Sequence, residues 1–214
     1  MNHNKNNSCP LCHSPSTPFC DYKTRLYYEC NTCKGIFLNP SQYMDFENEE
    51  KHYRFHNNDV EDQGYQNFVS PITNGILKDF SKEDSGLDFG AGTGSAISKV
   101  LRDNAYQIAE YDPYFHPFPE LLEKKYDYIA CCEVVEHFHH PAKEFQLLQK
   151  LLQPKGKLYC MTHLYHPEID FSNWYYKNDH THVFMYQKET MEWIRKTYGF
   201  SEVKIENRLI VFTN

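Results

Sequence analysis

The stretch that decides the fold is Gly86-Leu87-Asp88-Phe89-Gly90-Ala91-Gly92-Thr93-Gly94. A short apolar run ends at Asp88 and Phe89, three glycines follow at alternate positions, and a helical pattern covers residues 95–102. This order predicts a strand, a glycine turn and a helix. Glycine is needed where the backbone turns sharply and approaches a ligand without an intervening Cβ, and a helix N-terminus offers unpaired N–H groups. The stretch therefore predicts a ligand site built from backbone.

The spacing of the glycines distinguishes between ligands. The dinucleotide fingerprint G-x-G-x-x-G sets helix N–H groups against a pyrophosphate, whereas this chain has G-x-G-x-G with Asp88 two residues before the first glycine. An anion at that place repels a pyrophosphate but attracts the ammonium and sulfonium groups of S-adenosylmethionine. The P-loop pattern G-x-x-x-x-G-K-[ST] is also absent from the sequence.

A second predicted strand, residues 107–111, ends at Asp112, about twenty residues after the glycine turn. A carboxylate at that strand end can accept hydrogen bonds from both hydroxyls of a ribose. The alternative is a solvated turn aspartate before Pro113. The glycine turn upstream favours the ribose contact.

Three segments in this order, Leu87 to Gly94, Tyr111-Asp112-Pro113 and Tyr126 to His137, resemble class I methyltransferases. The resemblance covers residues 65–214 and implies an α/β, Rossmann-like methyltransferase sheet with an antiparallel last strand and S-adenosylmethionine as cofactor. The role of the Glu136-His137 pair stays open, because the pair can line the cofactor site or instead cap the helix that starts near Pro141. The cofactor-binding residues that the resemblance implies are Asp88, Gly90, Ala91, Gly92, Gly94, Asp112, Pro113, Cys132, Glu133, Val134 and His137.

The chain departs from the family pattern after Asp112. Only thirteen residues separate Asp112 from Tyr126, where a helix, a strand and another helix usually fit. Pro113, Pro117 and Pro119 forbid a long helix there. The third strand is therefore expected to be shortened or missing, and the acid that usually contacts adenine is not assigned.

The remaining segments alternate between helix and strand patterns. Apolar residues recur at fourfold spacing at Phe68, Ile72, Ile76 and Phe80, which predicts a helix from Tyr65 onward. Further helices are expected at residues 142–152 and 188–198, the second ended by Gly199, with strands at residues 157–162, 201–206 and 208–212.

An insertion at residues 163–187 is rich in histidine and aromatic residues and follows a predicted strand, where an open α/β sheet places its acceptor site. Within it, residues 179–183 resemble a stretch of methyltransferases that also carry N-terminal cysteine pairs. His180 and His182 have the intrinsic pKa of a general base and are the candidate catalytic residues. Hydrogen bonds that hold the loop are an equal alternative, and a histidine zinc site is the interpretation that the pattern favours least.

Two C-x-x-C pairs, Cys9/Cys12 and Cys30/Cys33, are separated by seventeen residues, which fits a tetrahedral four-cysteine zinc site. Gly35 is expected to give the second turn its backbone freedom. Four protein ligands leave no open position for water, so the predicted zinc is structural. The alternatives are a pair of disulfides, disfavoured because the polar segment at residues 1–7 has no secretory signal, and unrelated buried thiols, disfavoured by the regular spacing.

The 214 residues carry a net charge of −7, which gives no general attraction for a phosphate backbone and makes nucleic acid an unfavoured partner. No apolar run is long enough to cross a membrane, and we expect a cytoplasmic protein. The expected organisation is a zinc-ribbon-like module at residues 1–40, a connector or lid at 41–64 and a methyltransferase domain at 65–214.

Three functions fit these patterns. The first is methylation of a small-molecule acceptor at oxygen or carbon, which the acidity and the aromatic insertion favour. The second is methylation of an RNA base with the zinc module gripping the nucleic acid, although only Lys23 and Arg25 carry positive charge between its cysteine pairs. The third is a non-catalytic protein that binds zinc and cofactor and recruits a partner.

Overall fold

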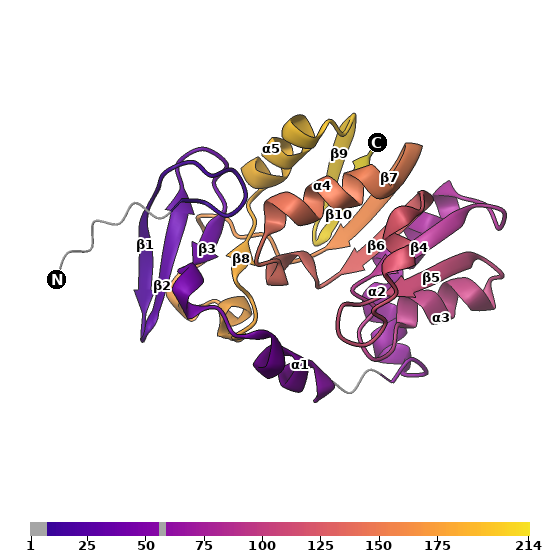
Figure 1. The fold of residues 1–214 in the computed structure, drawn as a ribbon, viewed down its shortest axis with the longest axis horizontal. Helices are drawn as coiled ribbons and strands as arrows, with labels where there is room; N and C mark the ends of the chain where they lie inside the picture. Colours follow the sequence, from indigo (N-terminus) through magenta and orange to yellow (C-terminus); the bar gives the residue numbers. More distant parts are fainter. Residues whose placement is uncertain (1–7, 56–58) are drawn as a thin grey trace.

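Among the described residues, the larger of two sheets has six strands (Figure 1). A computed structural model describes residues 8–55 and 59–214, so the N-terminal segment 1–7 and part of the connector lie outside the described residues. The strand order is β5-β4-β6-β7-β10-β9, with β4, β5, β6 and β7 parallel and β10 antiparallel to both of its neighbours. The strands are β4 (Ser85–Phe89), β5 (Gln107–Tyr111), β6 (Tyr126–Cys132), β7 (Leu152–Met161), β9 (Glu202–Glu206) and β10 (Leu209–Thr213). This arrangement confirms the predicted Rossmann-like methyltransferase sheet.

Helices cover both faces of this sheet. Helices α2 (Gln63–Asp79) and α3 (Ala96–Asp103) pack on one face, and α4 (Pro141–Leu151) and α5 (Lys188–Tyr198) lie on the other (Figure 1). Successive residues of a strand point to opposite faces. In β6, Tyr128 and Ala130 join the core beneath α2 and α3, while Ile129 and Cys131 join the core beneath α4. Both faces of the central strands are therefore buried, as expected for parallel strands.

The third strand of the usual pattern is missing from the described residues between β5 and β6. Only one short 3-10 helix, η2 (Pro119–Glu123), occupies this connection. Proline at its start fits a 3-10 turn, because proline has no N–H to donate. The short, proline-rich connection thus gives β5 an edge position.

The smaller sheet has the order β1-β2-β3-β8 and joins chain segments that are far apart in sequence. Strands β1 (Ser16–Tyr22), β2 (Arg25–Cys30) and β3 (Ile36–Leu38) belong to the cysteine module, whereas β8 (Phe184–Met185) comes from the insertion. Ile36 pairs with Met185 in antiparallel register. The cysteines Cys9, Cys30 and Cys33 lie in the same apolar core as the strands beneath α4. The module therefore shares a core with the larger sheet, and its own sheet is completed by β8 of the insertion.

The connector holds the 3-10 helix η1 (Pro40–Gln42) and the helix α1 (Phe46–Arg54). Figure 1 shows α1 between the smaller sheet and the far end of the larger one. The insertion contributes η4 (Phe171–Asn173) and η5 (Tyr175–Asn178), and η3 (Val135–His137) follows β6. None of the helices in the described residues is long and apolar enough to cross a membrane.

Three local expectations are corrected. Helix α2 buries Val69, Ile72 and Ile76, but Phe68 is 40% exposed and faces a cavity. Strand β7 begins at Leu152, earlier than expected, with an irregular register. Gly35 is not in the left-handed region; that conformation falls on Lys34, at φ 63°. Gly35 is instead required for space, because a Cβ there would overlap the ring of Phe184 on β8.

Candidate active site

A cavity of about 940 Å³ opens at the carboxyl ends of β4, β5 and β6. The glycine turn forms one wall, α1 and the start of α2 form others, and the insertion closes the far end. Among the residues expected at the site, those that line it are Gly90, Ala91, Gly92, Asp112, Pro113, Cys132, Glu133, Val134, His137 and His182. Asp88, Gly94 and His180 do not line it.

The glycine turn has the backbone conformation that only glycine adopts without strain. Gly90 has φ 84° and Gly92 has φ 62°, both in the left-handed region. A Cβ on Gly90 would also meet the side chain of Val134, with Cγ1 only 2.8 Å away. The backbone N–H groups of Gly90 and Ala91 donate to the carbonyl of Tyr111 at 2.8 and 3.1 Å. The end of β4 is therefore tied to the end of β5, and the turn is bare toward the cavity.

Asp112 is almost fully buried and fixes the geometry between the two strand ends. Its Oδ1 accepts the backbone N–H groups of Tyr114 and Phe115 at 2.8 and 3.0 Å, and its Oδ2 accepts the N–H of Gly92 at 3.0 Å. An ionised carboxylate has about four acceptor positions, so one remains, on Oδ2. Asp112 thus both holds its turn and offers one acceptor position toward a ligand hydroxyl.

Asp88 lies beneath the glycine turn and not on the cavity wall. Its carboxylate is buried and accepts hydrogen bonds from the hydroxyls of Ser95 and Ser98, at the start of α3. Burial raises the pKa of Asp88 to about 6, while the two serine hydroxyls lower it. Ser95 also caps α3, accepting the N–H of Ser98 at 3.1 Å. Ser95 and Ser98 thus hold the Asp88 carboxylate toward the start of α3, and its contact with the cofactor stays a prediction.

The segment after β6 bends back over the sheet at Glu133, which has φ 52°. The Glu133 N–H donates to the carbonyl of Met161 at 2.8 Å, and its carboxylate pairs with Arg208 at 2.6 Å. Burial raises the pKa of Glu133, and the positive charge of Arg208 partly opposes that rise. Arg208 comes from the turn between β9 and β10, so the closing hairpin supplies a side chain to the cavity.

Glu136 is fully buried beside this wall. Tyr176 donates its hydroxyl to Glu136 Oε1, while Oε2 has no hydrogen-bond partner among the described residues. Burial, followed by the charge of Glu133, raises the pKa of Glu136 to about 8. Neither Glu136 nor His137 caps α4, whose N-cap is His140 without a side-chain bond. That sequence-based alternative is therefore wrong.

His182 and His180 are placed very differently. His182 is buried on the cavity wall, whereas His180 is exposed and away from it. The His182 Nδ1 lies 2.6 Å from the carbonyl oxygen of Tyr176. A carbonyl only accepts, so Nδ1 carries the proton and the lone pair of the neutral ring is on Nε2. Burial lowers the pKa of His182, although nearby Asp179 raises it. Of the two candidate bases, only His182 faces the cavity.

Helix α1 supplies functional side chains that the sequence did not reveal. Glu49 accepts the hydroxyl of Tyr114 at 2.6 Å and lies 2.8 Å from Nε2 of His139. Tyr53 places its hydroxyl 3.1 Å from Nδ1 of His137. The connector was expected as a lid, but its acidic and aromatic residues lack a periodic pattern that would have singled out these two. Helix α1 thereby bridges the cofactor end and the insertion end of the cavity.

Arg25 of β2 holds the insertion through hydrogen bonds to its backbone. Its guanidinium donates to the backbone carbonyls of Lys177, Asp179 and His182 at 2.7, 3.2 and 3.2 Å. Five fixed donors suit such a multiple contact. Arg25 is one of the two positively charged residues between the cysteine pairs. Its guanidinium binds the insertion of the same chain.

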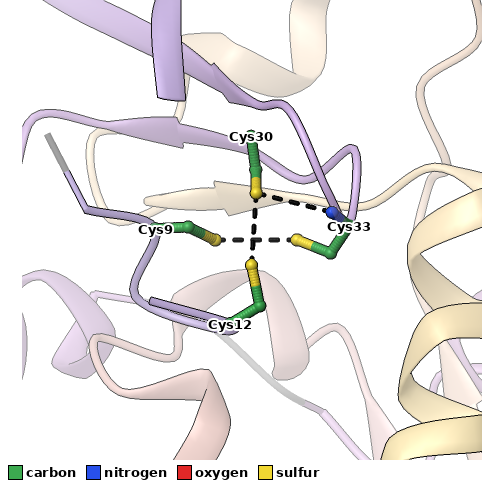
Figure 2. A group of neighbouring side chains, drawn as sticks. All are labelled: Cys9, Cys12, Cys30 and Cys33. Atoms are coloured by element: carbon green, nitrogen blue, oxygen red, sulfur yellow. Dashed lines mark hydrogen bonds between the residues drawn. The ribbon is translucent and has the colours of Figure 1, made fainter. Parts of the chain in front are cut away.

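The four N-terminal cysteines converge on one point (Figure 2). Cys9 Sγ lies 3.6 Å from Cys33 Sγ, and Cys12 Sγ lies 3.2 Å from Cys30 Sγ. Tetrahedral zinc with bonds of about 2.3 Å separates its sulfur ligands by roughly 3.8 Å. The N–H groups of Thr32 and Cys33 point to Cys30 Sγ at 3.4 Å. No disulfide joins the cysteines of the described chain, and the donor set fits zinc.

Comparison with known proteins agrees with this geometry. Residues 61–205 match a family model described as a methyltransferase domain. An O-methyltransferase family protein from Burkholderia thailandensis has a TM-score of 0.53 at 10% identity, with 77% of this chain and 61% of that one covered. Phosphoethanolamine N-methyltransferase 2 from Haemonchus contortus, in complex with S-adenosyl-L-methionine, has a TM-score of 0.53 at 16% identity, with 80% and 48% covered. The PH0226 protein from Pyrococcus horikoshii has a TM-score of 0.51 at 18% identity, with 76% and 98% covered.

At these identities the structural likeness shows the fold alone, and the chain spans 61% of the first of these proteins and about half of the second. No functionally curated protein matches the chain. The sheet order and the glycine turn match the fold of these methyltransferases. Because the family model matches more than half of its residues, the chain belongs to that methyltransferase-domain family.

Proposed function

We propose that the protein transfers a methyl group from S-adenosylmethionine to a small molecule, at an oxygen or carbon atom. The observation that carries this proposal is the cavity of about 940 Å³, which has the glycine turn at one end and buried polar groups at the other. Ligand cavities for small molecules span about 300–1,000 Å³. A volume at the top of that range suits a cofactor together with a modest acceptor.

The residues of the cofactor end fit S-adenosylmethionine. Gly90 and Gly92 leave the backbone bare, and Asp112 keeps one acceptor position for a ribose hydroxyl. Tyr111 and Phe115 add aromatic surface to the same wall, which suits a flat purine ring. When bound, the cofactor supplies an electrophilic methyl group on a positively charged sulfur.

The acceptor end is the part of the cavity between η3, α1 and the insertion. Its polar side chains include Glu133, His137 and His182, and its aromatic side chains include Tyr53 and Tyr176. In methylation at oxygen, an acceptor lone pair forms the new O–C bond while the C–S bond breaks and its electron pair goes to sulfur. The acceptor proton leaves to a side chain of this wall or to water. The protein's contribution is to align the two reactants and to exclude competing water.

We further propose that the four cysteines hold one structural zinc ion. Four sulfur ligands leave no position for a substrate, so this ion does not enter the transfer step. Its ligands Cys9, Cys30 and Cys33 lie in the apolar core shared with the strands beneath α4. Zinc at this place would stabilise the module against the methyltransferase sheet.

Calorimetry with S-adenosylmethionine tests the cofactor site. Asp112→Asn should weaken binding about 10- to 100-fold, because hydrogen bonds to a charged group contribute about 1.5–3 kcal/mol. Asp127→Asn is the matched control, since Asp127 also accepts a backbone N–H, that of Ser85, but does not line the cavity. Equal affinities in the two variants would remove Asp112 from the site.

A second assay addresses the acceptor. The protein is incubated with S-adenosylmethionine and separate sets of phenols, aliphatic alcohols, activated carbon acids and RNA, and S-adenosylhomocysteine is quantified. Turnover with a phenol, an alcohol or a carbon acid supports the proposal. Turnover with RNA alone, or cofactor binding without turnover in any set, would overturn it in favour of one of the other two functions.

A further inference from the structure

Three side chains from two distant segments meet beside the acceptor end of the cavity, and two of them, His137 and His182, line it. Glu136 and His137 follow β6, and His182 lies in the insertion. Each offers a ligand atom, and these atoms all lie within 4.8 Å of one another. One carboxylate and two imidazoles at such separations form a donor set that divalent metal ions take.

Both histidine rings are held by a backbone carbonyl at Nδ1. His182 Nδ1 donates to the carbonyl of Tyr176 at 2.6 Å, and His137 Nδ1 lies 3.1 Å from the carbonyl of Thr181. Ligating histidines usually fix their second nitrogen on a carbonyl or carboxylate in this way, which directs the other nitrogen to the metal. His182 Nε2 accordingly lies 3.9 Å from Glu136 Oε1, a separation that an ion between the two atoms can span.

The carboxylate of Glu136 is buried, and one of its oxygens lacks a hydrogen-bond partner in the described part of the chain. Glu136 is fully buried, its Oε2 accepts no hydrogen bond from any described residue, and Glu133 adds a second carboxylate nearby. Arg208 pairs with Glu133, but no lysine or arginine in the described residues forms an ion pair with Glu136. A buried polar atom without a partner is rare in native proteins, so Oε2 of Glu136 is available to a ligand.

We propose that Glu136, His137 and His182 bind a divalent metal ion whose open positions face the cavity and hold a hydroxyl oxygen of the acceptor. This inference rests on the proposed function and narrows it to methylation at oxygen. The mixed nitrogen and oxygen donors suit a first-row ion such as Mn²⁺ or Fe²⁺. The ion lowers the pKa of the bound hydroxyl, so that the proton leaves to water and the oxygen lone pair is ready to form the O–C bond.

The site is separate from the four-cysteine site in both position and chemistry. The cysteine cluster offers only sulfur, which selects zinc, whereas this site offers no sulfur. Mn²⁺ binds more weakly than zinc in the general order of affinities, so it leaves zinc on the thiolates. Mn²⁺ alone is therefore a suitable probe of the new site in the zinc-loaded protein.

The test is titration of the full, zinc-loaded chain with Mn²⁺, followed by the electron paramagnetic resonance signal of the free ion. One bound equivalent is expected. His182→Ala should weaken its affinity by about 100-fold or more, because even outer-shell changes cost 10- to 100-fold. His180→Ala is the matched control, since it removes an exposed imidazole two positions away that does not line the cavity. Glu136→Gln, which keeps the size of the side chain, should have an effect like that of His182→Ala.

Zinc content and calorimetric binding of S-adenosylmethionine report whether each variant is folded. If His182→Ala fails either check, Glu136→Gln decides the question. Absence of Mn²⁺ binding in the parent protein, or unchanged binding in a folded His182→Ala or Glu136→Gln variant, would overturn the metal site. If the parent protein does not bind S-adenosylmethionine, the proposed function is overturned instead. The two outcomes are distinguishable because the metal and the cofactor are titrated separately.

Discussion

Replacement of Gly90 by alanine tests why the turn contains glycine there. The change has two costs. A non-glycine residue in the left-handed region costs about 1–2 kcal/mol. The new Cβ would also overlap Val134, whose Cγ1 would be 2.8 Å away, and such overpacking costs about 1–3 kcal/mol. Gly90→Ala should therefore lower the free energy of unfolding by about 2–5 kcal/mol.

Gly199 provides a matched control. It ends α5 with φ 81°, close to the 84° of Gly90, but a Cβ there meets nothing within 4 Å. Gly199→Ala should cost only the backbone contribution, about 1–2 kcal/mol, and should leave cofactor affinity unchanged. In Gly90→Ala, relief of the overlap displaces Val134 on the cavity wall, so affinity should fall at least about tenfold, equivalent to about 1.4 kcal/mol.

Urea unfolding and calorimetry with S-adenosylmethionine measure the two effects. Val134→Ala removes both methyl groups that would overlap and leaves the Val134 Cβ, 3.2 Å from the new Cβ. In the Val134→Ala background, Gly90→Ala should therefore cost only the backbone contribution and no longer the packing contribution. The single variant Val134→Ala provides the reference for this double-mutant cycle. If Gly90→Ala is no less stable than Gly199→Ala, or if Val134→Ala gives no recovery, the steric reasoning is wrong.

Three further predictions concern stability. Gly35→Ala should lower the melting temperature by several degrees through its overlap with Phe184, as measured by calorimetry, and an unchanged transition would contradict the close approach. Burial raises the pKa of Asp79, but hydrogen bonds from Lys157 and a neighbouring tyrosine outweigh it and lower the pKa overall. The stabilising effect of the Asp79 carboxylate is therefore present above the unfolded pKa of about 3.9 and is lost as the pH falls through the lower pKa of the folded state. In urea unfolding, Asp79→Asn should be less stable than the parent protein at pH 7, and the two free energies of unfolding should converge near pH 3. Cys9→Ser, or prolonged treatment with a strong chelator, should release one zinc per chain by elemental analysis and lower the melting temperature; retention of zinc in the variant would argue against Cys9 as a ligand.

The central sheet could be predicted from sequence because its signals are local. The glycine turn, the carboxylate at the end of β5 and Gly199 at the end of α5 each determine the conformation of only a few neighbouring residues. The short segment after Asp112 likewise predicts the loss of a strand, since chain length and proline geometry decide it. Such features require no knowledge of what lies across the fold.

The sequence does not specify the features that depend on contacts between distant segments. Asp88 was expected at the cofactor, but the hydroxyls of Ser95 and Ser98 hold its carboxylate beneath the turn. The pairing of Glu136 with His182, and the choice between His180 and His182, depend on how the insertion folds back. No periodicity in either segment specifies that arrangement, because each side chain is placed by contacts with residues far along the chain.

The pairing of Ile36 with Met185 has a consequence for the order in which the protein folds on the ribosome. Strands β1 to β3 are synthesised first, yet their sheet gains its last strand only after β4, β5, β6 and β7 have emerged. Closing so long a loop costs more entropy than forming a hairpin, so the edge of β3 stays open during most of translation. The part of the chain that is made first is thus finished among the last.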